Sequence, residues 1–150
     1  MDIKSKEKRS ENMSKIRSRN TTPERFIRSL LHRNGFRYRV AYSGVVGKPD
    51  LYFTRKKVAV FVHGCFWHRH QGCKYAYTPK SNTDFWLAKF NSNVCRDSVV
   101  RSQLNSEGIR ILVVWECTIR KMMRDATLMQ EIFMKARNFL ERSSELYLEL

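Results

Sequence analysis

Hydrophobic residues recur at helical spacing near the start of the chain, within TTPERFIRSLLHRNG. This spacing predicts a helix with one buried face, formed by Phe26, Ile27, Leu30 and Leu31. We therefore expect a helix from Pro23 to about Asn34, with Thr22 as its N-cap. Proline suits the first turn of a helix, and Gly35 suits the position after its end.

Three segments that follow have the pattern of β-strands. In FRYRVAY, residues 36–42, apolar residues alternate with polar ones, which predicts a half-buried strand. Two apolar runs, DLYFT and KVAVFVHG, are separated by RKK and predict a β-hairpin. If the turn centres on Lys56, antiparallel pairing sets Asp50 opposite Val62. Asp50 then lies at the same end of the sheet as Val62 and His63.

The second half of the chain predicts two helices with a strand between them. A helical region extends from about Thr83 to Ser106, allows a break near residues 91–93 and ends at Gly108. RILVVWE is a continuous apolar strand of the kind that is buried on both faces. Beyond Cys117, a long amphipathic helix is expected from a stripe made of Leu128, Ile132, Phe133, Ala136, Phe139 and Leu140.

The predicted order of elements is helix, three strands, helix, strand, helix. This order predicts an α/β fold, or an α+β-like one, with a mixed sheet flanked by helices. Such an architecture alone does not name a function.

The charge balance points to a polyanionic partner. The chain has 150 residues, 42% of them hydrophobic, which suits one folded domain that we assign to residues 21–150. A total of 29 Lys and Arg against 14 Asp and Glu gives a net charge of +15. Because basic residues that neutralise phosphates release condensed counterions, we favour nucleic acid over a merely solvated charged surface. Residues 1–20 carry seven Lys or Arg and three acidic residues, and we interpret them as a basic DNA-contacting arm.

The sequence also limits the compartment. No apolar run approaches the roughly 20 residues of a membrane span, and the start, MDIKSKEKRSENMSK, lacks the apolar core of a secretory signal. We therefore expect an intracellular protein in a reducing compartment. Its four cysteines then suit metal ligands or buried thiols better than structural disulfides.

A cluster of potential metal ligands lies in FVHGCFWHRHQGC. The spacing C-x4-H-x2-C is formed by Cys65, His70 and Cys73. Cys117 directly follows RILVVWE, whose strand can lie beside the one that ends at His63. Thiolate and imidazole are ligands that Zn²⁺ prefers, and four of them form a closed structural site. We expect such a site, while the spacing alone also allows His63 and His68 as ligands or the cysteines as buried thiols. Cys95, isolated in NSNVCRD, is interpreted as a helix-packing residue.

Acidic and histidine residues gather at one end of the predicted hairpin. Asp50 follows GKP, and a carboxylate that projects from a strand end into a basic site is a natural Mg²⁺ ligand. Without the hairpin, Asp50 would be an ordinary strand-start residue; the hairpin brings it to the carbonyl of Val62 and to His63. His63 and His68 can exchange protons with water and with a leaving oxygen. Glu24 suits either a capping box or a role in orienting water at the metal or acting on His68.

Together these segments resemble one family, the very short patch repair (Vsr) DNA mismatch endonucleases. The matching pieces are RSENMSKIRSRNT, GKPD, FVHGCFWH, TDFWLAKF and VVWEC, in this order between residues 9 and 117. The residues after 117 contribute little. The resemblance implies a restriction-endonuclease-like core and a Mg²⁺-dependent nick 5′ to the T of a T:G mismatch, the lesion that deamination of 5-methylcytosine leaves.

The resemblance also divides the ambiguous histidines. It implies structural Zn²⁺ at Cys65, His70, Cys73 and Cys117, and catalytic roles for Asp50, His63, His68 and Glu24. Val62 would bind Mg²⁺ through its carbonyl oxygen. Restriction-type nucleases usually carry a second acidic residue and a lysine after the Asp strand, whereas FVHG has a histidine there. Arg69 and the pair QG depart from the histidine-rich form of the family's loop.

Aromatic residues complete the prediction. A metal-held loop could present Phe66 and Trp67 to DNA, where aromatic wedges unstack a base step at a cost of a few kcal/mol that is lowest at a mismatch. The resemblance adds Trp86 as a third wedge residue. Packing in the protein core is the alternative for all three residues. For Phe85 and Phe90, core packing is our interpretation. Asp97 matches a family position near the active site or is a solvated helix residue.

We therefore expect a strand-specific, zinc-stabilised and Mg²⁺-dependent mismatch endonuclease. Its partner would be double-stranded DNA with a T:G mismatch, and it would act as a monomer in contact with other mismatch-repair proteins, cytoplasmic and nucleoid-associated in a bacterium. One alternative is a restriction-type nuclease that cuts both strands of matched DNA. Another is a non-enzymatic zinc protein that only binds DNA.

Overall fold

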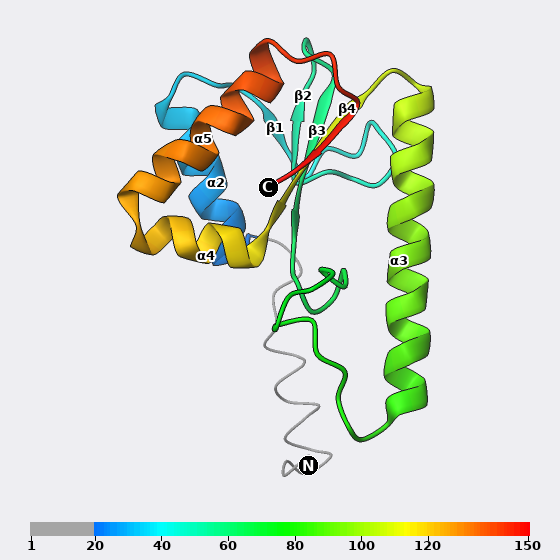
Figure 1. Ribbon diagram of the computed structural model, residues 1–150. Helices are drawn as coiled ribbons and strands as arrows, with labels where there is room; N and C mark the ends of the chain where they lie inside the picture. Colours follow the sequence, from blue (N-terminus) through cyan, green and yellow to red (C-terminus); the bar gives the residue numbers. More distant parts are fainter. Residues whose placement is uncertain (1–19) are drawn as a thin grey trace.

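The computed structural model describes residues 20–150, and at its centre is a mixed β-sheet (Figure 1). Its strands are β1 (Arg39–Val40), β2 (Leu51–Phe53), β3 (Val58–His63), β4 (Arg110–Trp115) and β5 (Tyr147–Glu149). They lie side by side in the order β1-β2-β3-β4-β5. The first three strands pair antiparallel, and β3, β4 and β5 pair parallel. The predicted basic arm at residues 1–20 lies outside the described residues, apart from Asn20.

Helices cover both faces of the sheet. They are α2 (Thr22–Arg33), α3 (Thr83–Ser106), α4 (Glu116–Arg124) and α5 (Ala126–Glu141). Helices α2, α4 and α5 lie on one face, and the long helix α3 lies on the other (Figure 1). Helix α3 belongs to the crossover that joins the parallel strands β3 and β4. Because these strands end together at the paired residues His63 and Trp115, the segments that follow them begin at the same edge of the sheet.

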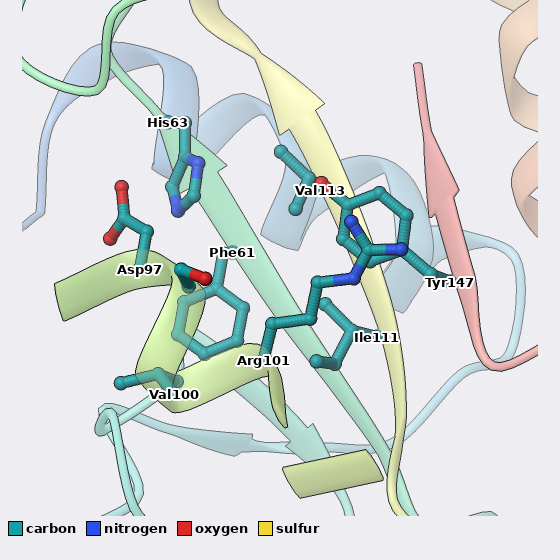
Figure 2. Close-up of a pocket in the computed structure, with 9 residues that line it drawn as sticks. Phe61, His63, Asp97, Val100, Arg101, Ile111, Val113 and Tyr147 are labelled. Carbon is teal, nitrogen blue, oxygen red and sulfur yellow. The ribbon is translucent and has the colours of Figure 1, made fainter. Parts of the chain in front are cut away.

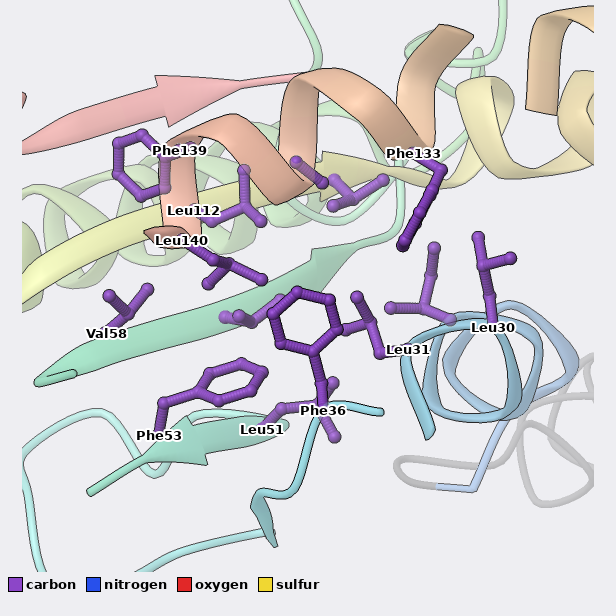
Figure 3. Close-up of a cluster of buried hydrophobic side chains, with 14 of the residues drawn as sticks. Leu30, Leu31, Phe36, Leu51, Phe53, Val58, Leu112, Phe133, Phe139 and Leu140 are labelled. Atoms are coloured by element: carbon purple, nitrogen blue, oxygen red, sulfur yellow. The ribbon is translucent and has the colours of Figure 1, made fainter. Parts of the chain in front are cut away.

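The larger core lies between the sheet and helices α2, α4 and α5. Figure 3 shows that Leu30 and Leu31 of α2, together with Phe36, lie near Phe133 of α5 on the same face of the sheet. Alternate side chains of β3 point to opposite faces of the sheet, since Val60 belongs to this core and Ala59 to the cluster under α3. Both are fully buried, which explains why the central strands are apolar throughout.

The predicted mixed α/β fold is confirmed, with corrections of detail. The N-cap of α2 is Thr21 rather than Thr22, because the Thr21 side chain accepts a hydrogen bond from the Glu24 main-chain N–H. The predicted helix at 83–106 is confirmed and has no break at residues 91–93. The hairpin is confirmed, but its register is offset by one residue. Leu51 pairs with Val60, which sets Asp50 opposite Phe61 rather than Val62.

The predicted order of elements is wrong at the C-terminal end. Asp125 has an extended backbone and its side chain accepts hydrogen bonds from the N–H groups of Thr127 and Leu128, so the expected long helix is two helices. A fifth strand, β5, then pairs with β4. The strand predicted at residues 36–42 shortens to two residues, and Val40 is 45% exposed.

Within residues 20–150, every helix is too short or too polar to cross a lipid bilayer.

Candidate active site and metal centre

Asp50 immediately precedes β2 and contacts β3. Its Oδ2 accepts a hydrogen bond of 2.7 Å from the main-chain N–H of Val62, so these two residues meet even though the register is offset. Burial raises the pKa of the Asp50 carboxyl to about 6, partly opposed by this hydrogen bond, and the nearby charge of Glu24 raises it further. The ionised carboxylate is therefore unfavourable in its surroundings unless a cation lies beside it.

The two histidines of the predicted active site are in contact. The rings of His63, at the end of β3, and His68, in the following loop, stack with their centroids 3.9 Å apart and their planes at 3°. The Nδ1 atom of His68 lies 2.7 Å from Oδ2 of Asp97 on α3. Burial lowers the pKa of His63 to about 3, and the charge of His68 lowers it further. His63 is therefore neutral near pH 7, and Asp97 orients the ring of His68.

Glu24 is buried at the start of α2, with 6% of its surface exposed. Its carboxylate accepts hydrogen bonds from the main-chain N–H of Asn20 at 2.8 Å and from Arg28 at 3.1 Å. The capping interpretation of Glu24 is thus supported with one change. Its carboxylate binds the main-chain N–H of the residue before the N-cap, rather than that of the N-cap itself. Glu24 also acts electrostatically on Asp50, so it belongs to the same group of side chains.

A groove of about 750 Å³ lies over this group. Glu24, Val62 and His68 line it. Three basic residues, Lys89, Arg96 and Arg120, also line it, together with Glu116, which is paired with Arg120. Lys89 and Arg96 beside a carboxylate and histidine cluster attract a phosphate backbone to the place where those groups can act on it.

A smaller cavity of about 190 Å³ lies between α3 and the sheet, beside His63. Figure 2 shows His63 and Asp97 at one end of this cavity and Arg101 beside the ring of Tyr147 at the other. The guanidinium carbon of Arg101 lies 3.4 Å from the centroid of the Tyr147 ring. Strand β5 therefore holds α3 one helical turn beyond Asp97, where the packing of α3 on the sheet is interrupted.

The four predicted zinc ligands come together. Three sulfur atoms and one imidazole nitrogen lie within 4.8 Å of one another, from Cys65, His70, Cys73 and Cys117. The Nδ1 atom of His70 lies 3.6 Å from Sγ of Cys65 and 3.4 Å from Sγ of Cys117. Burial raises the pKa of Cys65 to about 12, so its thiolate needs a cation. This set of ligands fits structural Zn²⁺.

Trp115 separates the two clusters. At the end of β4, its indole stacks on His70 with centroids 4.2 Å apart and meets the edge of His63 at 5.3 Å. His70 therefore lies with the three cysteines, whereas His63 and His68 lie together on the other side of Trp115. Cys95 lies on α3, outside the sulfur cluster, and it is exposed, so the prediction that it packs in the helix interface is wrong.

Aromatic rings gather between the zinc loop and the start of α3. We call this the aromatic cluster, and it consists of Phe66, Trp67, Tyr77, Trp86 and Phe90. The ring of Phe66 lies 5.0 to 5.5 Å from the other four centroids. All three residues predicted as DNA wedges are therefore in one place. The predicted packing of Phe90 is confirmed, whereas Phe85 is 61% exposed and is not a core residue.

Two residues that position the site are absent from the sequence predictions. Asn93 is buried, and its side-chain N–H donates to the carbonyl of Trp67 at 3.0 Å. Arg69 binds several carbonyl groups of the zinc loop. The spacing of Lys89, Asn93 and Arg96 on one face of α3 is a signal for the groove, because such residues align along a helix. The role of Arg69 has no comparable signal, because its partners depend on the folded loop.

Comparison with known proteins identifies the relatives of this chain. The family model described as "DNA mismatch endonuclease Vsr" matches residues 1–74. The nicking enzyme V.XorIIP of Xanthomonas oryzae is 43% identical over 118 residues, which cover 79% of this chain and 86% of that protein. The nicking enzyme V.NmeAIP of Neisseria meningitidis is 45% identical over 119 residues, which cover 79% of this chain and 84% of that protein. The DNA mismatch endonuclease Vsr of Escherichia coli is 40% identical over 119 residues, with 79% and 76% coverage.

These relatives and the basic groove define the class of this protein, which is a DNA-nicking endonuclease. The chain belongs to the Vsr DNA mismatch endonuclease family.

Proposed function

We propose that this protein nicks double-stranded DNA 5′ to the T of a T:G mismatch that arises from a deaminated 5-methylcytosine. The observation that carries the proposal is the contact of Asp50 with Val62, next to the stacked pair His63 and His68, beneath a groove with basic walls. This arrangement joins a carboxylate, two imidazoles and a phosphate-attracting surface. The similarity to the E. coli mismatch endonuclease supports the choice of substrate.

Mg²⁺ fits the oxygen atoms at Asp50. The raised pKa of this carboxyl marks a buried negative charge that lacks sufficient compensation. In an extended strand the N–H and C=O of one residue point to the same side. Because the N–H of Val62 points at Asp50, its carbonyl oxygen is directed to that side too. Asp50 and Val62 would hold the ion, which supplies charge stabilisation at the scissile phosphate.

The histidines would move the protons of the reaction. Asp97 engages Nδ1 of His68, which leaves Nε2 of that ring free to accept a proton from the attacking water or to donate one to the leaving oxygen. His63 remains neutral because its pKa is about 3, so it orients and shields the His68 ring rather than competing for the proton. Glu24 would help to order water beside Asp50.

Nicking assays test the proposal directly. With Mg²⁺, the protein should cut a labelled duplex on the T strand of a T:G mismatch, across a panel of flanking sequences. Asp50→Ala should abolish cutting and retain binding. Absence of nicking on every flank would overturn the proposal. Equal cutting of both strands of matched DNA would favour a restriction-type nuclease, and binding without nicking would favour a non-enzymatic zinc protein.

The proposal also covers the domain organisation, the metal content and the partners of the protein. We infer a restriction-endonuclease-like core, structural Zn²⁺ at the cysteine and histidine cluster, and an N-terminal basic arm at residues 1–20 that contacts DNA beside one domain at 21–150. We also infer a monomer that meets other mismatch-repair proteins in the bacterial cytoplasm at the nucleoid. Phe66, Trp67 and Trp86 would enter the base stack at the mismatch, where unstacking costs least.

A further inference from the structure

Arg69 is the most extensively bonded side chain of the zinc loop among the residues described. Its Nη1 donates to the carbonyls of Phe66 at 3.2 Å and Tyr77 at 2.9 Å. Its Nη2 donates to the carbonyl of Ala76 at 2.8 Å and to the hydroxyl of Thr78 at 3.2 Å. The two ends of the guanidinium fork therefore join the start of the loop to the segment beyond the last zinc ligand.

The same guanidinium also contacts α3. Its central carbon lies 3.8 Å from the centroid of the Phe90 ring and 5.8 Å from that of Phe66. Arginine is suited to this position because its planar fork can donate several hydrogen bonds and stack on an aromatic face at the same time. The backbone of Arg69 has a φ of 57°, in the left-handed region, a cost that these contacts offset.

The zinc cluster and Arg69 hold different parts of the loop. The metal ligands within the loop are residues 65, 70 and 73, whereas the acceptors of Arg69 are residues 66, 76, 77 and 78. Two members of the aromatic cluster, Phe66 and Tyr77, are among the residues that Arg69 binds. Zinc alone therefore leaves the orientation of the cluster incompletely determined.

We propose that Arg69 is a positioning residue for mismatch recognition, which holds Phe66, Trp67 and Trp86 in the orientation that enters the base stack before DNA binds. This inference rests on the proposed function. Its energetic basis is preorganisation, because an aromatic surface that is already ordered loses less conformational freedom on binding. The guanidinium acts through its fork and its stacking. Its four terminal N–H groups are engaged by the loop, so it is not a phosphate contact.

Arg69→Lys separates the positioning role from a charge contact with a phosphate, since lysine keeps the charge and loses the planar fork. Arg55→Lys, in the exposed turn of the hairpin, is the matched control. In free protein, quenching of tryptophan fluorescence by acrylamide should increase for Arg69→Lys and not for Arg55→Lys. Trp115 is 7% exposed and contributes little to this signal, which therefore reports on Trp67 and Trp86. Because no DNA is present, this result tests the positioning role even if the protein fails to nick T:G duplexes.

With a T:G duplex, Arg69→Lys should bind about tenfold more weakly than the parent protein, a loss of about 1.4 kcal/mol, because the aromatic surface must then be ordered on binding. A 2-aminopurine next to the mismatch should brighten less on binding, because fewer bases are unstacked. Zinc content should not change. Parental quenching and binding in Arg69→Lys would overturn the proposal, and so would loss of zinc, which would assign Arg69 to folding of the loop.

Arg69→Gln supplies the second test. The slope of log affinity against log salt should equal that of the parent protein, because the number of phosphate contacts is the same. A slope smaller by about 0.9 would mark Arg69 as a phosphate contact and overturn the proposal.

Discussion

The imidazole rings of His63 and His68 lie parallel, with centroids 3.9 Å apart and planes at 3°. Two positively charged rings at this separation would repel each other, so the stack favours at most one imidazolium ion. Burial and the neighbouring His68 keep the pKa of His63 at about 3, and the carboxylate of Asp97 faces His68. His63 is therefore neutral near pH 7, and the contact with Asp97 gives His68 different surroundings from those of its stacking partner.

The neutral state of His63 should make stability fall in acid. Between the ordinary histidine pKa of 6.5 and the folded value of about 3, the unfolded chain takes up a proton that the native His63 does not. The free energy of unfolding should therefore decrease as pH falls through this window, by up to about 1.4 kcal/mol per pH unit. His63→Gln should remove this component, measured as the difference between the two proteins in urea unfolding at several pH values. Identical pH dependence in both proteins would contradict the assignment.

Asp97→Asn should lower the nicking rate without weakening DNA binding. The amide cannot hold the imidazolium of His68 as a carboxylate does, so we expect a loss of about tenfold to a hundredfold in single-turnover rate. Asp84→Asn, exposed in the first turn of the same helix, is the control and should nick at the parental rate. A full rate in Asp97→Asn would show that the contact with His68 has no part in the reaction.

Asp50→Asn should stabilise the protein in the absence of divalent metal. The carboxyl pKa is raised from 3.8 to about 6, so the native state holds a proton that the unfolded chain releases between these values. Stability is lost as pH rises through that window, and the ionised Asp50 then costs about 2 to 3 kcal/mol. Asparagine avoids this cost and still accepts the Val62 hydrogen bond. Thermal unfolding of the zinc-loaded proteins at pH 8, in Mg²⁺-free buffer without a chelator, should show a higher Tm for Asp50→Asn, and added Mg²⁺ should raise only the Tm of the parent protein. A lower Tm for Asp50→Asn in the Mg²⁺-free buffer would contradict the assigned pKa.

Regular periodicity in the sequence predicts the parts of the fold that local sequence determines. The bounds of α3, the strand β4 and the hairpin all follow from apolar patterns and turn residues. The hairpin register differs by one residue from the expected one because the sequence alone leaves the centre of the turn free by one position. Strand β5 is not predicted by the sequence because its three residues are stabilised by pairing with β4, which no local pattern shows.

The candidate site was predictable only in part for the same reason. Residue types and spacing suggest metal ligands in FVHGCFWHRHQGC, and the family resemblance divides the histidines between two clusters. The contact of His68 with Asp97 joins residues 29 positions apart, on a loop and a helix that meet only in the folded chain. The register error did not remove the contact of Asp50 with Val62, since a side chain at a strand end can reach one residue farther.

Cys117→Ser should separate a true zinc ligand from an ordinary thiol. Loss of one of four ligands should reduce bound zinc, measured by mass spectrometry of the native protein or by a chromogenic chelator. The free energy of unfolding should fall by at least about 3 kcal/mol, because zinc binding contributes directly to folding. Cys95→Ser, at an exposed position on α3, is the control and should keep both. Undiminished zinc in Cys117→Ser would remove this residue from the site.

Gly47 and Gly108 offer a matched test of how the loop before Asp50 packs on α3. Both have left-handed backbones, with φ of 83° and 76°. A Cβ atom at Gly47 would collide with the side chain of Val100, whereas one at Gly108 would meet nothing within 4 Å. Gly108→Ala should cost only the backbone strain of about 1 kcal/mol. Gly47→Ala should cost about 1 to 3 kcal/mol more in urea unfolding.

The collision at Gly47 should also affect catalysis. Val100 lies on α3 close to Asp97, beside the cavity under His63, so displacement of the helix would disturb the pairing of Asp97 with His68. Gly47→Ala should therefore nick more slowly than Gly108→Ala at a temperature at which both proteins are folded. Equal stability and equal rates in the two variants would mean that the loop yields without moving α3. In that case the packing of Gly47 on Val100 would have no part in holding the active site together.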